Sequence, residues 1–400
     1  MDSLLVINSG SSSIKFSLFS IKYDVDSKLK KEYSGMIDKI LLEPSILIKD
    51  SVDQKILQKN IKFSGEKETF YEQAIDKIME FVKTKGYKLA AAGHRIVHGG
   101  PKYSNPTILT NEIIDYLFSL TPIMPLHQPY NLEGVKILQK KFPTLLQIGC
   151  FDTGFHATCN PISQHYALPK EITDAGVRRY GFHGLSYEYI ASQLPKYMSK
   201  KEAKGKFIIA HLGNGATMCA VKNQKSVATS IGFTGVGGLP MGTRPDSLDP
   251  GVMLYLMNTY KMDTKAMNDF IYKKCGLLGV SGISSDMRTL LESNTADAKL
   301  AIDIFVHRIT LFVGSLAAEL EGFDSLIFTG GIGENASLIR EMVCKRLKWW
   351  GILIDKKKNA DNNQKISTKK SKITVWVIPT NEELIIANHT LKKYLTNGKF

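Results

Sequence analysis

Two turns built from small residues are the first features of this sequence that could do chemistry. The stretch "NSGSSSIK", from Asn8 to Lys15, stands between apolar "LLVI" and an alternating run, which predicts a strand, a tight turn and a second strand. Backbone N–H groups and hydroxyls in such a turn can point outward into a concavity that suits phosphate oxygens, and Lys15 adds a positive charge. The stretch is not a P-loop, because G-x-x-x-x-G-K-[ST] is absent. A plain hairpin turn is the alternative interpretation.

Arginine and histidine are concentrated in the glycine-rich stretches. Five of the eight arginines (Arg95, Arg178, Arg179, Arg244 and Arg288) stand in such stretches, which suggests planar recognition of anions. In "RRYGFHGLS", His183 is flanked by glycine and could hydrogen-bond a phosphoryl group, although a lone histidine is more often structural. In "GLPMGTRPDSLDPG", Arg244 is held in a constrained loop and could stabilise charge that develops in phosphoryl transfer. A surface turn is the alternative for that loop. The histidines show no zinc-ligand spacing on a clear helix.

The stretch "FTGGIGENA" offers a competing interpretation. Gly331, Gly333 and Ala336 fit G-x-G-x-x-[GA] between a predicted strand and a predicted helix, and Asp355 follows Ala336 by 19 residues, as in a Rossmann fingerprint. Only about 45 residues follow Asp355, which is too few for the rest of a dinucleotide domain. The stretch more economically lines the adenosine of one mononucleotide.

The elements that must position these residues occur in a repeated pattern. A second predicted hairpin, "FIIAHLGNGATMCAV" at 207–221, has the turn Gly213-Asn214-Gly215 and starts about 200 residues after the first. The repeat suggests two related lobes whose turns face a shared cleft. Helical periodicity appears at 71–86, 112–122 and 299–320, and strands alternate with helices, so the sequence predicts an α/β protein. The Lys/Asn-rich segment 356–372 is expected to be an exposed loop.

Length and composition narrow the class of protein. A chain of 400 residues predicts two domains, and 43% hydrophobic with 22% charged residues is typical of a globular protein. The apolar runs are shorter than the roughly 18 to 20 residues that span a bilayer, and the N-terminus lacks a signal-peptide pattern. The net charge of +14 comes mainly from dispersed lysines, which favours a solvated surface over a nucleic-acid partner. Five widely spaced cysteines favour a reducing, cytoplasmic compartment and argue against disulfides.

Taken together, the motifs resemble the acetokinase family of the acetate and sugar kinase/Hsp70/actin superfamily. The resemblance covers nearly the whole chain through "NSGSSSIK", "GHRIVHGG", "PLHQP", "FDTGFH", "RRYGFHG", "HLGNGAT", "GFTGVGGLPMGTRPDSLDPG", "GVSGISSDMR", "GGIGEN" and "PTNEEL". It implies a two-lobed actin-like (ribonuclease H-like) fold with duplicated βββαβαβα lobes, and a homodimer with no nucleic-acid or membrane partner. It also implies reversible phosphoryl transfer from ATP to acetate, giving acetyl phosphate and ADP, with Mg²⁺ or a substituting Mn²⁺. We expect the N-terminal lobe, on the acyl side, at 1–151 plus 384–400, and the C-terminal lobe, for nucleotide binding and dimerisation, at 152–383.

The resemblance also implies roles for individual residues. Asp152, His183, Arg244 and Arg95 would be catalytic, with Arg95 binding the carboxylate as well. Asn8 and Glu382 would hold the metal, although adjacent Glu383 is an alternative. The acyl pocket would be bordered by Val97, Leu126, His127, Phe182 and Gly235, in addition to Arg95. The nucleotide would contact Ser11, Ser13, Lys15, His211, Leu212, Gly213, Asn214, Gly215, Asp286, Met287, Arg288, Gly331, Ile332, Gly333, Glu334 and Asn335.

One departure from the family pattern bears on the substrate. Many relatives have proline where Gly235 stands, and glycine there could leave room for a longer acyl chain. We therefore expect acetate as the first substrate and propionate, or another short-chain carboxylate, as the second. A non-catalytic actin-like or Hsp70-like module is the distant alternative. Whether Asp152 acts as a base or orients its neighbours stays open at this point.

Overall fold

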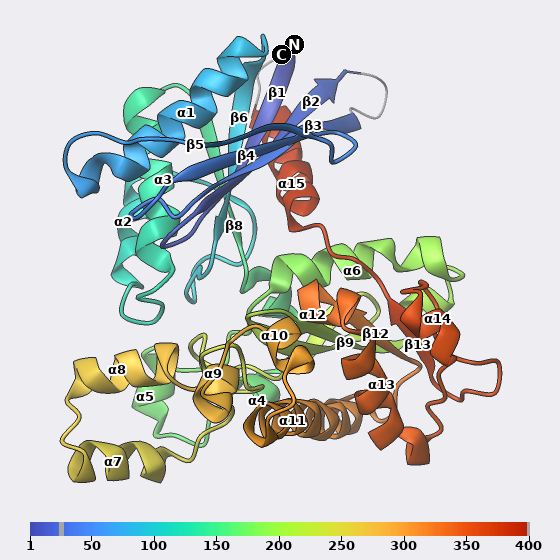
Figure 1. Cartoon of the computed structure of the whole chain (residues 1–400). Coiled ribbons are helices and arrows are strands. Elements are labelled where there is room, and N and C mark those ends of the chain that lie inside the picture. Colours follow the sequence, from blue (N-terminus) through green and yellow to red (C-terminus); the bar gives the residue numbers. More distant parts are fainter. Residues whose placement is uncertain (24–27, 398–400) are drawn as a thin grey trace. The chain divides into compact units, whose positions relative to one another are not determined.

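The chain divides into two compact units. The computed structural model describes residues 1–23 and 28–397 (Figure 1). Unit 1 comprises Met1–Gly154 and the C-terminal segment from Asn381, and unit 2 comprises Phe155–Thr380. The boundaries expected from the sequence, 151/152 and 383/384, each differ from these by three residues. As a result Asp152 and Glu382 belong to unit 1 and not to the second lobe.

Unit 1 is built on an eight-stranded sheet with the order β5-β4-β3-β2-β1-β6-β8-β7. Strands β1 to β5 pair in antiparallel fashion, whereas β1, β6 and β8 are parallel neighbours. The first hairpin follows the sequence prediction, with Ser9 opposite Ile14 across the turn. The strands are β1 (Asp2–Ser9), β2 (Ile14–Lys22), β3 (Lys28–Asp38), β4 (Ser45–Asp50), β5 (Lys55–Asn60), β6 (Lys88–Ile96), β7 (Thr107–Ile108) and β8 (Leu146–Phe151).

Helices cover both faces of the unit 1 sheet. The helices are α1 (Phe70–Thr84), preceded by a short turn at Lys67–Thr69, then α2 (Asn111–Ser119), α3 (Gln128–Lys141) and α15 (Glu382–Asn397). Helix α1 buries Tyr71, Ala74, Ile75, Ile78 and Val82, the periodic stripe that its sequence predicts. Ala92 of β6 packs in the core cluster with α1 and α3, whereas a Cβ atom on neighbouring Gly93 would contact α15. Because adjacent residues of a strand point to opposite faces, α15 lies on the face opposite α1 and α3.

Unit 2 repeats the central strand arrangement of unit 1. Its sheet has the order β11-β10-β9-β12-β13, formed by β9 (Lys206–Leu212), β10 (Ala216–Lys222), β11 (Lys225–Thr229), β12 (Ser325–Thr329) and β13 (Thr374–Val377). Two antiparallel pairs are followed by two parallel pairs, as in β3-β2-β1-β6-β8 of unit 1. The repeat inferred from the two hairpins is therefore a duplication of the whole strand pattern, and the α/β prediction is confirmed.

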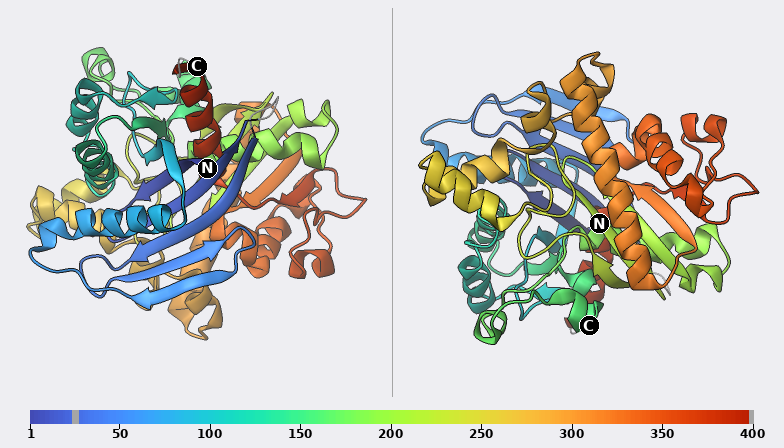
Figure 2. Two further views of the ribbon diagram at one scale, coloured as in Figure 1. Left: turned by 90° about the horizontal axis from the view of Figure 1, so that it is seen from above. Right: turned by 90° about the horizontal axis from the view of Figure 1, so that it is seen from below.

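The helices of unit 2 include two that pack on its sheet. Helix α6 (Gly184–Tyr197) contributes Tyr187, Ile190 and Leu194 to a core cluster with one face of the sheet. Helix α11 (Ala296–Leu320) contacts β9, β10 and β11 and crosses the sheet in the right view of Figure 2. The others are α4 (Pro161–Gln164), α5 (Lys170–Asp174), α7 (Pro250–Thr259), α8 (Thr264–Lys273), α9 (Gly276–Ser281), α10 (Met287–Glu292), α12 (Gly330–Asn335), α13 (Ser337–Arg346) and α14 (Lys356–Ala360), with short 3₁₀ turns at Gly154–Thr158, Glu202–Lys204 and Lys348–Trp350.

Two segments of unit 2, helix α11 and residues 356–372, stand out by their composition. Within the described residues, α11 is long and apolar enough to cross a membrane, but the residues it buries pack inside unit 2, so we interpret it as a core helix. The segment 356–372 is not a simple exposed loop. It begins with α14, and Asn359, Ile366 and Ser367 are buried. Asn359 is buried because its side chain and backbone oxygens accept hydrogen bonds from Arg340, a partner that the local composition does not reveal.

Candidate functional site

The predicted polar residues of unit 1 meet where three parallel strands end. Asn8 is near the end of β1, Arg95 near the end of β6, and Asp152 directly follows β8. Since the carboxyl ends of neighbouring parallel strands share one edge of a sheet, this topology brings the three side chains together. Glu382 joins them as the first residue of α15. We call these four residues the unit 1 cluster.

Arg95 is the centre of the unit 1 cluster. Its Nε donates to Asp152 Oδ1 at 3.0 Å, and its second terminal nitrogen donates to Asp152 Oδ2. Its first terminal nitrogen donates to Asn8 Oδ1 at 3.3 Å, and Glu382 Oε2 lies 3.9 Å from Nε. The Asp152 side chain is only 1% exposed, whereas that of Arg95 is 17% exposed. Asp152 therefore fixes the plane of the guanidinium while part of it stays accessible.

The charges of the unit 1 cluster depend on one another. Burial opposes the charge on Arg95, but attraction from Asp152 and Glu382 raises the pKa of its guanidinium above the ordinary value. Burial is the main cause that raises the pKa of Glu382, and repulsion from Glu383 adds to it, while Arg95 and Lys15 act in the opposite direction. A further cation beside Glu382 would favour the ionised carboxylate.

Asn131, which the sequence did not indicate as a site residue, connects this edge of the sheet to α3. Asn131 of α3 is buried, accepts from the backbone N–H of Val97 at 3.0 Å, and donates to the carbonyl of Ser9. Leu126 and His127 directly precede α3. Asn131 therefore links the ends of β1 and β6 to the helix that follows the predicted acyl-pocket residues. Nothing in the local sequence marks it, because its two partners lie at the ends of β6 and β1, 34 and 122 residues away in the chain.

The corresponding edge of the unit 2 sheet carries histidines. His211 is near the end of β9, and His183 directly precedes α6 with a left-handed φ of 55°. Their rings stack with centroids 4.3 Å apart and an interplanar angle of 20°. His183 Nδ1 lies 2.9 Å from Thr217 Oγ1, and His211 Nδ1 lies 2.8 Å from Ser186 Oγ. Buried Phe182 lies next to His183, and its carbonyl accepts from His156 Nε2 at 3.0 Å.

A pocket of about 640 Å³ in unit 2 gathers half of the residues predicted to contact a nucleotide. It is lined by Gly213, Asn214, Ser285, Asp286, Met287, Arg288, Leu291, Gly331, Ile332, Asn335 and Ala336. Gly330 has a φ of 77°, and a Cβ atom there would lie 2.8 Å from the Leu212 carbonyl oxygen. Glycine at this position therefore lets the start of α12 approach the end of β9 closely. We call this the glycine-lined pocket. Its volume suits a small-molecule ligand.

Other predicted nucleotide residues support this pocket without lining it. Glu334 Oε1 accepts from the backbone N–H of Gly330 at 2.9 Å and of Thr380 at 3.1 Å. Sequence analysis missed Arg340, which is fully buried and donates to the carbonyls of Gly333 and Glu334 at the end of α12. Burial lowers the pKa of Arg340 to about 10.

Arg244 is held by its own loop. Its first terminal nitrogen donates to the Gly235 carbonyl at 2.9 Å, and its guanidinium lies 5.6 Å from the centre of the Tyr272 ring. Burial lowers the pKa of Arg244, and Tyr272 partly offsets that effect. The loop also needs Gly276, because a Cβ atom there would lie 2.6 Å from the Arg244 carbonyl oxygen. The two residues singled out in this loop, Arg244 and Gly235, are therefore direct partners.

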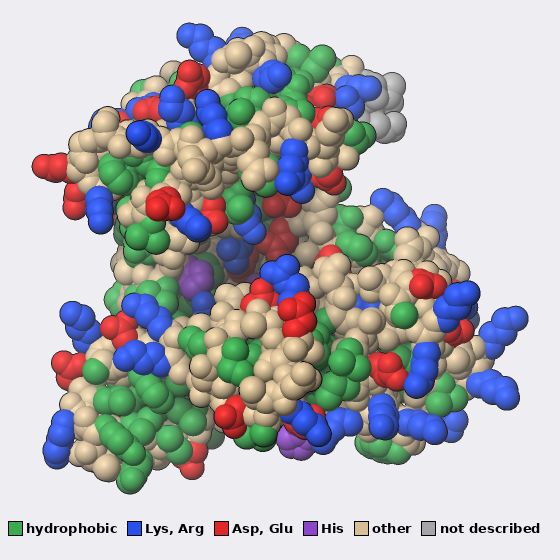
Figure 3. All heavy atoms as spheres, in the orientation of Figure 1, with side chains coloured by type: hydrophobic (Ala, Val, Ile, Leu, Met, Phe, Trp, Pro, Cys, Tyr) green, Lys and Arg blue, Asp and Glu red, His purple; other side chains and the backbone are tan. Residues whose placement is uncertain are grey.

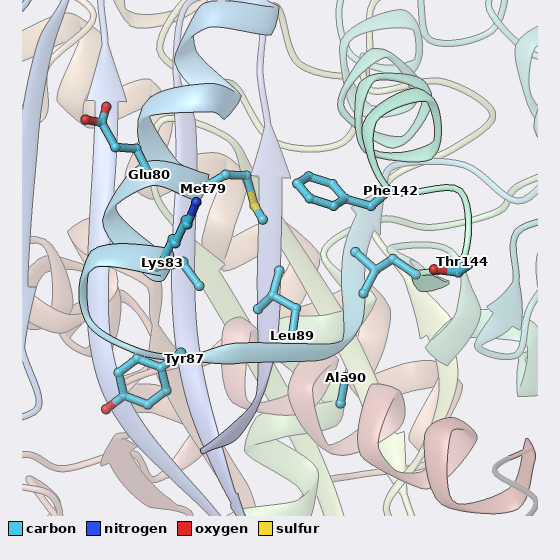
Figure 4. Close-up of a pocket in the computed structure, with 10 residues that line it drawn as sticks. Met79, Glu80, Lys83, Tyr87, Leu89, Ala90, Phe142 and Thr144 are labelled. Atoms are coloured by element: carbon cyan, nitrogen blue, oxygen red, sulfur yellow. The ribbon is translucent and has the colours of Figure 1, made fainter.

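Unit 1 also contains a cavity of about 530 Å³ outside its cluster. In Figure 4, Met79 and Lys83 of α1 lie near Leu89 of β6 and near Phe142, which follows α3. Its walls are mainly apolar and contain none of the predicted site residues. This cavity carries no part of the functional proposal.

The fold and the two sites define a class of protein. Two units with the same strand pattern, one with a carboxylate–guanidinium cluster and one with a glycine-lined pocket, are the arrangement of an actin-like two-lobed kinase. The sequence profile of the acetokinase family matches residues 3–388, and the chain belongs to this family. Membership makes it a phosphotransferase with a carboxyl group as acceptor and with ATP and ADP as nucleotide substrates.

Individual relatives agree with this assignment. The acetate kinase of Rickettsia prowazekii is 46% identical over 396 residues, which cover 98% of this chain and 99% of the relative. The acetate kinase of Nitrobacter hamburgensis is 43% identical, with 99% of this chain and 97% of the relative covered. Among solved structures, a propionate kinase from Francisella tularensis matches with a TM-score of 0.89 at 34% identity, covering 98% of this chain and all of that one. The Porphyromonas gingivalis acetate kinase matches with a TM-score of 0.83 at 36% identity, covering 98% and 99%.

Proposed function

We propose that this protein transfers the γ-phosphoryl group of ATP reversibly to acetate, giving acetyl phosphate and ADP. The observation that carries the proposal is Arg95, whose guanidinium is fixed by Asp152 but remains partly exposed. A guanidinium has five N–H donors, and Asp152 and Asn8 use three of them here, so two remain for a substrate carboxylate. The acetate kinases that resemble this chain over nearly its whole length support the choice of acceptor.

The mechanism needs little proton transfer. Acetate is already an oxyanion, so the main barrier is to bring it against the negative charge of a phosphoryl group. Arg95 binds and orients the acetate, and Arg244 stabilises the charge that develops on the phosphoryl oxygens. His183 donates a hydrogen bond to the same oxygens. Positioning of the two substrates supplies much of the rate enhancement.

We assign Asp152 a positioning role. Both of its carboxylate oxygens accept from Arg95, and the side chain is buried. Since acetate has no proton to remove, a base at this position would have no function in the forward reaction. Asp152 instead holds the Arg95 guanidinium in the orientation that an incoming carboxylate requires.

The oxygens of Asn8 and Glu382 fit a role in holding Mg²⁺. Mg²⁺ prefers carboxylate and amide oxygens together with substrate phosphates. Burial raises the pKa of Glu382 in the protein alone, and a divalent cation would compensate for that cost. When bound, Mg²⁺ would neutralise charge on the nucleotide phosphates. Mn²⁺ has similar ligand preferences and is expected to substitute.

Ser11, Ser13 and Lys15 are proposed to contact the phosphates. Ser11 and Lys15 are exposed, and Ser13 is partly exposed, at the turn between β1 and β2. The glycine-lined pocket is proposed to hold the rest of the nucleotide, with His211 and Gly215 beside it. Val97, Leu126, His127, Phe182 and Gly235 remain the proposed acyl-pocket residues.

Propionate is the second candidate substrate. Gly235 has no side chain to narrow the proposed acyl pocket, and the Francisella propionate kinase is similar in structure at a TM-score of 0.89. We expect acetate to have the higher kcat/KM, and a higher value for propionate would reassign the substrate.

We further propose a homodimer in the cytoplasm. Helix α7 is apolar but buries none of its residues, and its Leu254 and Tyr255 are 62% and 58% exposed. Figure 3 shows hydrophobic side chains gathered over α7, at the lower left. Such a patch is typical of an interface, and a second copy of the chain is the proposed partner. None of the five cysteines, all of which lie in the described part of the chain, forms a disulfide, and four are buried, which suits a reducing compartment.

A hydroxylamine trap tests the proposed activity. The protein is incubated with ATP, Mg²⁺, acetate and hydroxylamine, which converts acyl phosphates to hydroxamates. We expect acetohydroxamate only when ATP and acetate are both present. Folded protein that forms no hydroxamate from acetate or propionate would refute the proposal.

A further inference from the structure

We propose that Tyr187 and Thr217 hold His183 as a neutral imidazole whose proton is on Nε2. This inference rests on the proposed function for its significance, because His183 is the residue assigned to the phosphoryl group. The arrangement of hydrogen bonds, however, can be tested without any substrate. All groups involved belong to unit 2.

The argument starts at the Tyr187 hydroxyl, which is fully buried in α6. Its oxygen accepts a hydrogen bond from the backbone N–H of His211, and burial raises its pKa well above the ordinary value, so it keeps its proton. The hydroxyl lies 2.5 Å from Thr217 Oγ1. Since the backbone N–H can only donate, the Tyr187 proton is directed to Thr217.

The second step is the Thr217 hydroxyl, which is also fully buried. Its two hydrogen-bond partners are Tyr187 and the Nδ1 atom of His183, at 2.9 Å. Because Thr217 accepts from Tyr187, its own proton has one acceptor available, which is His183 Nδ1. A proton on His183 Nδ1 would leave the Thr217 proton buried without an acceptor, and such groups are rare in native structures.

The third step concerns the other ring nitrogen of His183. With Nδ1 accepting, the neutral ring carries its proton on Nε2. This nitrogen faces the second glycine turn, because a Cβ atom on Gly215 would lie 3.2 Å from it. Gly213 and Asn214 of that turn line the glycine-lined pocket. We call the hydrogen-bond chain from Tyr187 through Thr217 to His183 the relay. It presents an N–H donor, and not a lone pair, on the side of the His183 ring that faces the glycine-lined pocket.

The stacked neighbour disfavours a charged form of His183. The ring of His211 lies at a centroid distance of 4.3 Å, so two positive charges there would repel each other strongly. Tyr187 and Thr217 are thus positioning residues, and His183 acts as a neutral hydrogen-bond donor.

Nitrogen-15 NMR of histidine-labelled full-length protein at pH 7.5, without substrates, tests the relay. The His183 signals are assigned by their loss in His183→Gln. We expect the pattern of a neutral ring protonated on Nε2. In Tyr187→Phe, the Thr217 hydroxyl no longer accepts a hydrogen bond from Tyr187 and can instead accept one from His183 Nδ1–H. Signals of an Nδ1-protonated form of His183 should therefore appear. A wild-type ring protonated on Nδ1 or on both nitrogens, or an unchanged pattern in Tyr187→Phe, would overturn the inference.

Kinetics provide a second readout with a matched pair of variants. Thr217→Val removes the hydroxyl and is expected to lower kcat about tenfold while KM for ATP changes less than about twofold. Thr217→Ser restores the hydroxyl and should return kcat to within about threefold of wild type. An equal loss in both variants would contradict a role for the hydroxyl. If the NMR pattern is as expected but His183→Gln keeps full activity, the relay stands and the proposed role of His183 in transfer fails.

Discussion

Protonation of buried His156 is predicted to destabilise unit 2 in mild acid. His156 is 1% exposed, its Nε2 donates to the Phe182 carbonyl, and its Nδ1 lies 2.9 Å from Ser226 Oγ. Burial lowers the pKa of His156 to about 4 from an ordinary value of 6.5, and the bond to Phe182 offsets only part of this. The unfolded chain therefore binds a proton at a higher pH than the folded chain does. Stability from this group is fully present above pH 6.5 and is lost as the pH falls toward 4.

The size of the destabilisation follows from how far the pKa of His156 is lowered. One pKa unit corresponds to about 1.4 kcal/mol, so the full contribution is on the order of 3 kcal/mol. Between pH 7.5 and pH 5, linkage predicts a loss of about 2 kcal/mol from His156 alone. That is a large share of the typical stability of a domain, which is about 5 to 15 kcal/mol.

Tryptophan fluorescence isolates this effect, because all three tryptophans (Trp349, Trp350 and Trp376) lie in unit 2. Urea unfolding is measured at pH 7.5 and pH 5 for wild type and His156→Gln. We expect the wild type to lose about 2 kcal/mol more than the variant between the two pH values. His307→Gln, at an exposed site in unit 2, is the control and should behave like the wild type. An equal pH dependence in wild type and His156→Gln would refute the reasoning.

Three further substitutions test the supports of the two sites. Arg340→Met leaves the Gly333 and Glu334 carbonyls unpaired, so the free energy of unfolding of unit 2 should fall by about 3 kcal/mol in the same fluorescence assay, and a loss below about 1 kcal/mol would contradict this. In Asp152→Asn, the Arg95 guanidinium is no longer held in one orientation, so kcat/KM for acetate in the hydroxamate assay should drop about 10²-fold. An unchanged value would show that Asp152 does not position Arg95 for the reaction. Asn131→Ala deletes the acceptor of the Val97 amide, whose hydrogen exchange should become faster, whereas unchanged protection would show that the Asn131 link is not needed there.

The sequence predicted those parts of the site that depend on local patterns. Apolar runs separated by small residues identified both hairpins, and arginines inside glycine-rich stretches singled out Arg95 and Arg244. Asp152 could be placed near Arg95 from the sequence only through the family resemblance, because the contact depends on β6 and β8 being parallel neighbours.

The sequence did not reveal contacts that depend on strand register or that join residues far apart in the chain. Thr217 and Tyr187 look like ordinary strand and helix residues, and their role depends on the pairing of Thr217 with His211 across the hairpin. Asn359 stands in a lysine-rich segment that appears fully solvated, yet it is buried because Arg340 needs acceptors inside unit 2. Helix α7 was not expected, since its apolar residues stay exposed instead of forming a buried stripe.

The dependence of carboxylate phosphorylation on both Arg95 and Arg244 is tested most directly by initial rates of acyl phosphate formation. Wild type, Arg95→Ala, Arg244→Ala and the exposed control Arg346→Ala are compared with ATP, Mg²⁺ and acetate, after each variant is shown to be folded. We predict that the control keeps the wild-type kcat/KM and that Arg95→Ala and Arg244→Ala each lose on the order of 10³-fold. Either of these two variants retaining activity within about tenfold of wild type would contradict the proposed site.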